Sequence, residues 1–78
     1  MRRRVTPPGE ILCSIETERE TDRRWIAEAI ELSGVLAYGT TRFDATSRCV
    51  ALALRVVAEK IEFDKMRIAS LKITIASN

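Results

Sequence analysis

The sequence predicts a two-layer α+β domain in the order β-β-β-α-β, an antiparallel sheet with one long helix packed on one face. Three short stretches before residue 40 have the pattern of strands, and a fourth lies close to the C-terminal end. An amphipathic stretch of about twenty residues, without a helix breaker, separates the third stretch from the fourth. The chain has 78 residues, which is enough for one domain with one small core.

Residues 1–9 are predicted to be a flexible basic tail, and residues 10–78 to form a single domain. Arg2 to Arg4 precede the run Pro7-Pro8-Gly9, which interrupts regular structure. These arginines account for the net charge of +2, so the rest of the chain is slightly acidic. No apolar segment of a signal peptide follows them, and no stretch is long enough to cross a membrane, so we expect a cytoplasmic protein.

A hairpin is predicted over residues 10–19 and 25–29. Apolar and more polar side chains alternate in its first segment, as in a strand buried on one face, with the apolar positions at Ile11, Cys13 and Ile15. The polar run Glu20-Thr21-Asp22-Arg23 forms the turn. A third short strand is predicted over residues 35–38, between two glycines.

The helix is predicted from Arg42 to about Glu62. Thr41 is a good N-cap residue, and Asp44 stands where a carboxylate suits both the capping box and the helix dipole. At about 100° per residue, the predicted buried face comprises Phe43, Thr46, Val50, Ala53, Val57 and Ile61, flanked by Cys49, Leu54 and Val56. A turn at Asp64 and Lys65 leads to the last predicted strand, over residues 71–75.

A single helix leaves the other face of this sheet without a cover. By the alternation, that face carries some mixture of Leu12, Ile26, Leu36 and Tyr38 beside Ser14, Glu16 and Glu28, and a one-residue slip in the strand register would swap the two faces. A partly apolar sheet face with no covering element is typical of a contact surface. We therefore expect a protein partner, and we expect the chain to form a homo-oligomer.

Catalysis and metal binding are not expected. The sequence has no histidine, the commonest general acid–base residue and metal ligand. Cys13 and Cys49 lie far apart without metal-type spacing, so we expect free, buried thiols. A two-metal nuclease needs several converging carboxylates. The candidates are Glu16, Glu18, Glu28 and Asp44, and arginines crowd the hairpin that carries most of them. We predict no catalytic residue, no metal and no cofactor.

Between Trp25 and Glu62, an ordered set of short motifs resembles the HicB family of bacterial antitoxins. Small members of that family have an aromatic residue after a hairpin turn, then a segment like P-E-L-P-G, then Y-G-x-T, then E-A opening a long helix. The corresponding segments here are Arg24-Trp25-Ile26-Ala27-Glu28-Ala29, Ile30-Glu31-Leu32-Ser33-Gly34, Tyr38-Gly39-Thr40-Thr41, Asp44-Ala45 and Ala51-Leu52-Ala53-Leu54-Arg55-Val56. The resemblance covers most of the chain from Ile11 onward, and its specificity lies in the order of the motifs.

The resemblance implies a sheet like a truncated ribonuclease H fold and a role in a type II toxin–antitoxin system. Members of the family neutralise HicA, a small toxin that cleaves messenger RNA, by covering it without catalysis of their own. The chain departs from the family pattern at Ile30 and Ser33, where prolines are usual. Phe43 replaces a usually acidic residue, and at a helix start it is either buried or part of an interface. Many members continue into a DNA-binding domain; none is predicted here, so we do not expect operator binding.

Four residues are candidates for partner binding, namely Arg24, Trp25, Tyr38 and Leu52. Arg24 has a second interpretation as a solvated turn residue, Trp25 as packing on the sheet, and Leu52 as a single exposed leucine. Two other functions are compatible with the sequence. One is nucleic-acid binding by the arginines of the tail and the hairpin, and the other is an orphan subunit of the same fold that assembles without a toxin.

Overall fold

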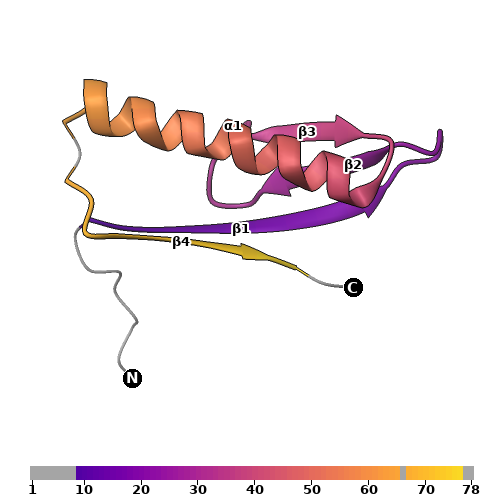
Figure 1. The fold of residues 1–78 in the computed structure, drawn as a ribbon, viewed down its shortest axis with the longest axis horizontal. Helices are drawn as coiled ribbons and strands as arrows, with labels where there is room; N and C mark the ends of the chain where they lie inside the picture. Colours follow the sequence, from indigo (N-terminus) through magenta and orange to yellow (C-terminus); the bar gives the residue numbers. More distant parts are fainter. Residues whose placement is uncertain (1–8, 66, 77–78) are drawn as a thin grey trace.

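The computed structural model describes residues 9–65 and 67–76, and it has one mixed sheet with one helix packed on it (Figure 1). The elements follow the predicted order and lie close to the predicted bounds. They are β1 (Glu10–Arg19), β2 (Trp25–Ala29), β3 (Leu36–Gly39), α1 (Arg42–Phe63) and β4 (Ser70–Ile75). The predicted α+β fold is confirmed. The expected basic tail at Arg2 to Arg4 lies outside the described residues.

The strands lie side by side in the order β3-β2-β1-β4. The pairs β1–β2 and β2–β3 are antiparallel, as predicted, whereas β4 lies parallel to β1 (Figure 1). The sheet is therefore mixed, and the prediction of a wholly antiparallel sheet was wrong for β4. This direction follows from the connection, because α1 carries the chain from β3 back across the sheet before β4 begins. The first and last strands of the domain are therefore neighbours, and β1 lies in the interior of the sheet.

The face of the sheet toward α1 carries the core. The pairs Thr17↔Ala27 and Cys13↔Ile73 place every second residue of each strand on this face. The buried apolar residues are Cys13, Ile15, Ala27, Ala29, Val35, Ala45, Cys49, Ala53 and Val57. Most of these side chains are small, and the largest that is fully buried is Ile15. Such a core allows α1 to approach the sheet closely but buries little apolar area.

Gly39 shows how closely the start of α1 approaches β3. A Cβ atom at this position would lie 2.5 Å from the backbone nitrogen of Ala45. Real Cβ atoms do not approach backbone that closely, so a side chain here would displace the first turn of α1. The glycine is therefore required by packing.

The helix begins as predicted. The hydroxyl of Thr41 accepts a hydrogen bond from the backbone N–H of Asp44 at 3.0 Å, and Thr41 itself has extended backbone angles. One turn later, the guanidinium of Arg48 lies 3.4 Å from the Asp44 carboxylate. At the other end, the N–H of Asp64 donates to the carbonyl of Lys60, and Lys65 takes a positive φ of 55° that ends the helix. No helix of the described residues is long and apolar enough to span a membrane.

Two residues of the predicted buried face of α1 are exposed. Phe43 has 81% of its surface exposed and Leu54 has 43%. The prediction was wrong for these residues because α1 packs over β1, β2 and β3 and does not extend over β4. A helix is about 10 Å across, whereas four strands at about 4.8 Å spacing span roughly 14 Å between the outer ones. One side of the apolar face of α1 therefore has no strand below it.

Candidate protein-binding surfaces

Large apolar side chains of the described residues lie mostly outside the core. Those with a third or more of their surface exposed are Leu12, Ile30, Leu36, Tyr38, Phe43, Leu54, Phe63, Ile68, Leu71 and Ile75. The core beneath them consists largely of alanine, cysteine and valine. Most of the exposed residues gather on two surfaces, one on each side of the sheet. Exposed apolar patches are typical of contact surfaces for proteins or membranes, of ligand-binding grooves and of aggregation-prone regions.

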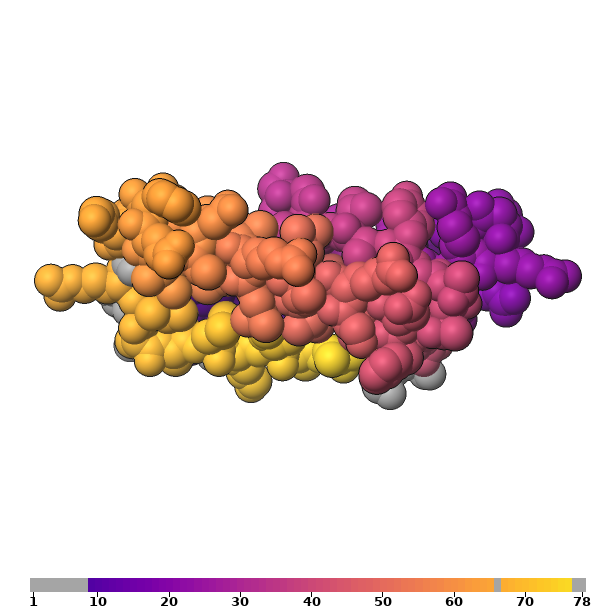
Figure 2. All heavy atoms as spheres, turned by 45° about the horizontal axis from the view of Figure 1, so that its top comes forward, coloured from indigo at the N-terminus to yellow at the C-terminus, as the bar shows by residue number. Residues whose placement is uncertain are grey.

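The first surface is a groove between α1 and β4, named here the α1–β4 groove. Its lining residues are Arg42, Phe43, Thr46, Ser47, Val50, Ala51, Leu54 and Ile75, and its volume is about 620 Å³. In Figure 2 the yellow side chains of β4 lie along one edge of the molecule, beside the magenta and orange helix. The groove is thus built from two elements that are far apart in the sequence.

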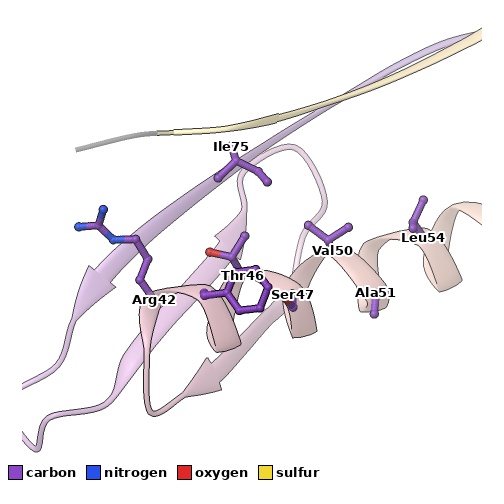
Figure 3. A pocket seen from close by; sticks show the side chains of 8 residues that line it. Arg42, Thr46, Ser47, Val50, Ala51, Leu54 and Ile75 are labelled. Carbon is purple, nitrogen blue, oxygen red and sulfur yellow. The ribbon is translucent and has the colours of Figure 1, made fainter.

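The side chains of the α1–β4 groove are nearly all uncharged. Figure 3 shows Ile75 on β4 pointing toward α1, where Thr46 and Val50 face it, while the guanidinium of Arg42 lies to one side. Leu71 and Ile73 lie on the same face of β4 as Ile75, because they occupy alternate positions of one strand. The groove therefore continues along the uncovered side of β4 as an apolar strip.

The second surface is the side of the sheet away from α1, named here the far sheet face. It carries Leu12, Ser14, Glu16, Glu18, Ile26, Glu28, Leu36 and Tyr38 from the first three strands. The residues expected on this face all lie on it, and pairs such as Glu16↔Glu28 and Ile26↔Tyr38 fix the register that the alternation left open. No element of the described residues covers it.

Carboxylates occupy the centre of the far sheet face. Glu16 lies directly opposite Glu28 on the neighbouring antiparallel strand, and Glu18 lies opposite Ile26. A shallow hollow of about 80 Å³ is lined by Glu16, Thr17, Glu18, Ile26 and Glu28. Like charges placed directly across a strand pair destabilise it. A cationic group bound between Glu16 and Glu28 would turn this repulsion into attraction.

Arg24 and Tyr38, two of the predicted partner-binding residues, meet at the margin of the far sheet face. The Arg24 guanidinium lies 4.5 Å from the centre of the Tyr38 ring. It also forms an ion pair with Asp22 at 2.8 Å, and hydrogen bonding to Arg24 lowers the pKa of the Asp22 carboxyl. These contacts hold an aromatic ring and a cation together at an exposed position.

Trp25 and Leu52, the other two candidates, lie away from that margin. Trp25 is half-buried on the α1 side of the sheet, and the Arg42 guanidinium lies 4.8 Å from the centre of its ring. Leu52 is also half-buried and packs against the core. The structure therefore brings Arg24 together with Tyr38, but it does not bring these two together with Trp25 or Leu52.

The α1–β4 groove was not predicted from the sequence. The one indication in the sequence was the wide apolar face of α1. One helix cannot bury so wide a face against a sheet, so some of its apolar residues had to stay exposed. The groove is formed by Phe43 and Leu54 together with the apolar strip on β4. It could be predicted only if the position of β4 at the edge of the sheet were already known.

Glu31 also has a role that the sequence did not reveal. Its carboxylate accepts hydrogen bonds from the backbone N–H of Ser14 at 2.6 Å and from the Ser14 hydroxyl at 2.8 Å. Glu31 lies just beyond the end of β2, so its side chain satisfies a backbone donor of β1 where the ladder between the two strands ends. These hydrogen bonds lower the pKa of Glu31.

The two cysteines are free thiols in the core between the sheet and α1. Burial raises the pKa of both Cys13 and Cys49. The Cys49 thiol lies 3.9 Å from the Val35 carbonyl oxygen, to which it donates. Within residues 9–65 and 67–76 no cluster of three or more potential ligands could hold a metal ion.

Comparison of the chain with family models, with curated proteins and with solved structures gives no match.

Proposed function

We propose that this chain is an antitoxin-like protein-binding module that neutralises a small, HicA-type, mRNA-cleaving toxin by occlusion and has no catalytic activity of its own. The observation that supports it best is the far sheet face, which combines exposed apolar residues with central carboxylates and has no cover among the described residues. The ordered motifs between Trp25 and Glu62 supply the type of partner. Both members of such a pair act in the cytoplasm, where the thiols of Cys13 and Cys49 stay reduced.

The charge of the far sheet face favours a basic partner. Glu16, Glu18 and Glu28 lie on its two central strands. They outnumber two basic residues of the same face, Lys72 on the edge strand β4 and Arg24 at the margin, where Arg24 is paired with Asp22. A protein that cleaves RNA must attract the phosphate backbone, so its working surface is positively charged. The acidic face thus complements the surface that an inhibitor has to cover.

Aromatic and aliphatic side chains beside the carboxylates provide the apolar part of this contact. Tyr38 lies opposite Ile26, and Leu36 lies opposite Glu28. Interface energy usually concentrates in a few central residues, with tyrosine and arginine enriched among them. Tyr38 with Arg24 is accordingly proposed as the anchor, and the carboxylates as the groups that orient the toxin and speed its association.

We also propose that the chain self-associates, through the α1–β4 groove. A core in which the largest fully buried side chain is Ile15 gives a chain of this size little stability of its own. The groove is apolar and nearly uncharged, so two copies meet there without the repulsion that the acidic far sheet face would cause. The two surfaces thus serve different partners.

Co-purification with a charge-reversal control tests toxin binding. The tagged full-length chain is expressed in its native host, and co-purifying proteins are identified by mass spectrometry and assayed for RNA cleavage. We expect a small basic protein whose ribonuclease activity is inhibited by the wild-type chain. The variant Glu16→Lys/Glu28→Lys should lose both binding and inhibition, while it keeps a like-charge pair across the strands.

The matched control is Glu59→Lys/Glu62→Lys, which makes the same charge change on exposed residues of α1. It should bind and inhibit like wild type. Equal loss in both variants would show that only net charge matters and would contradict docking on the far sheet face. RNA bound directly by the purified chain, with an affinity that falls steeply with salt, would replace the proposal with nucleic-acid binding.

A further inference from the structure

We infer that a second copy of this chain pairs with β4, edge to edge and antiparallel, to form one continuous eight-stranded sheet. This inference deepens the proposed self-association and rests on it. It starts from the position of β4 at one end of the strand order, with β1 as its only strand neighbour among the described residues. Unpaired strand edges bind further strands unless charges, prolines, bulges or a cover prevent it.

The pairing of β4 with β1 determines which backbone N–H and C=O groups of β4 point away from β1. The N–H of Ala76 donates to the carbonyl of Ile15, and Ile75 is the residue that pairs with Ile15. In a parallel ladder, hydrogen bonds to one neighbour use every second residue. The even-numbered residues of β4 therefore bond to β1. Leu71, Ile73 and Ile75 direct their N–H and C=O groups outward, away from the sheet.

This pattern selects the register of the pairing. Antiparallel strands exchange hydrogen bonds between residues whose backbone groups both point toward the partner. A two-fold axis at Ile73 pairs Ile73 with Ile73 of the second copy and Leu71 with Ile75, so all three outward residues are used. This register also places Lys72 opposite Thr74. A shift that centres the axis on Lys72 would place two lysines face to face, which is unfavourable.

The side chains agree with this arrangement. Leu71, Ile73 and Ile75 all lie on the α1 side of β4, so pairing joins two apolar strips over one surface. Leu71 of the second copy then lies beside Ile75 on the open side of the α1–β4 groove, where it packs against the lining residues Phe43 and Leu54. Lys72 is the only charged residue of β4, and it lies on the opposite side of the strand.

The available area is sufficient for a small homodimer. A specific interface needs about 500 Å² from each partner, half of a total near 1,000 Å². Phe43 alone offers roughly 150 Å², because an aromatic side chain presents about 150–250 Å² and this one is 81% exposed. Leu54, Leu71 and Ile75 together expose more than one whole aliphatic side chain, and the six-residue edge of β4 adds its backbone.

Charge variants at Thr74 test the register. Thr74 is exposed on the far side of β4, so its replacement leaves the fold intact. Thr74→Lys places two lysine pairs across the interface and should raise the dimer dissociation constant roughly fivefold. Thr74→Glu places two attractive pairs there and should lower it by a similar factor. Thr21→Lys, an exposed turn residue far from β4, carries the same charge change and should leave it unchanged.

Disulfide trapping gives an independent readout. Copies of Ile73→Cys have Cα atoms about 5.5 Å apart across a hydrogen-bonded pair, within the range that a disulfide spans. Copies of Lys72→Cys lie two residues out of register, at about 8 Å, which is outside that range. Cys13 pairs with position 73 across the β1–β4 ladder, so both variants also carry Cys13→Ala to prevent an intrachain disulfide. We expect mild oxidation to link Ile73→Cys and not Lys72→Cys.

Sedimentation analysis of the full-length chain over a concentration series supplies the dissociation constants, against a monomer mass of 8.8 kDa. A dimer that responds oppositely to the two Thr74 variants supports the pairing. A monomer at every concentration overturns the pairing and the proposed self-association together. A dimer that is indifferent to both variants leaves self-association standing and overturns the β4 register. Toxin binding by the far sheet face is measured separately and is not affected by either result.

Discussion

The two long sides of α1 meet the sheet in different ways. Over β1, β2 and β3 the contact is closed, and the helix contributes mostly small side chains such as Ala45, Cys49 and Ala53. Toward β4 the contact is open, and the helix contributes Phe43 and Leu54 to a groove. On the closed side these residues are small where two elements approach closely, whereas on the open side Phe43 and Leu54 remain largely exposed. The same helix thus combines a side that forms the core with a side whose large apolar residues stay exposed.

The largest expected effect on the free energy of unfolding comes from truncating one isoleucine on the closed side of α1 and one on the open side. Ile15 is completely buried, whereas Ile75 in the α1–β4 groove is 52% exposed. Ile15→Ala should lower the free energy of unfolding by about 3 kcal/mol, and Ile75→Ala by about 1 kcal/mol. Urea denaturation at a concentration where the chain is monomeric measures both. An equal loss in the free energy of unfolding for both variants would contradict the distinction between a closed and an open side of α1.

Enlarging a side chain should also change the free energy of unfolding much more on the closed side of α1 than on the open side. Gly39→Ala puts a Cβ atom against the backbone of Ala45 and should cost about 2–3 kcal/mol. Ala51→Leu adds a larger group to the open groove and should change the free energy of unfolding by less than about 0.5 kcal/mol. Thermal unfolding followed by circular dichroism compares them. A stable Gly39→Ala variant would show that the first turn of α1 can move away from β3.

Replacing Phe43 tests whether the open side of α1 contributes to dimerisation and not to the stability of the monomer. Because most of its surface is exposed, Phe43→Ser should change the stability of the monomer by less than about 0.5 kcal/mol. It should raise the dimer dissociation constant roughly tenfold, since it removes the largest apolar side chain of the groove. Phe63→Ser, an equally exposed phenylalanine at the other end of α1, is the control and should leave dimerisation unchanged. The reverse ranking would place the interface elsewhere.

The smallest expected effect concerns Glu31 and depends on pH. Hydrogen bonds from Ser14 lower its pKa below the ordinary value of 4.5, so folding favours the ionised carboxylate. Its contribution to stability is therefore complete above that pH and is lost as the pH falls through the lower pKa of the folded state. Glu31→Gln should cost under about 1 kcal/mol at neutral pH, because the site is exposed.

Denaturation of the wild type and of Glu31→Gln across the acidic range checks this sign. The difference between the two proteins should shrink as the solution is acidified. Asp22, whose pKa is also lowered, is present in both proteins and cancels from the comparison. A difference that grows on acidification would contradict the assigned role of Glu31.

Much of the fold was predictable because its determinants are local. Alternation gave β1 and β2 their bounds, and Thr41 marked the start of α1 through its capping hydroxyl. Alternation also grouped Glu16, Ile26 and Tyr38, but the strand pairing was needed to fix their register. The unpredicted features depend on contacts between distant segments. No short stretch of sequence predicts the parallel pairing of β4 with β1 or the sideways position of α1 that exposes Phe43. The same holds for the hydrogen bond from Ser14 to Glu31.

The pairing of the first strand with the last also governs how the chain can be made. Glu10 pairs with Ser70, so β1 pairs with β4 only after residues 70–75 have left the ribosome. Until then, one edge of the ten-residue β1 strand has no neighbour, although β2, β3 and α1 have already been synthesised. Until β4 emerges, the nascent chain therefore leaves one edge of β1 open to mispairing.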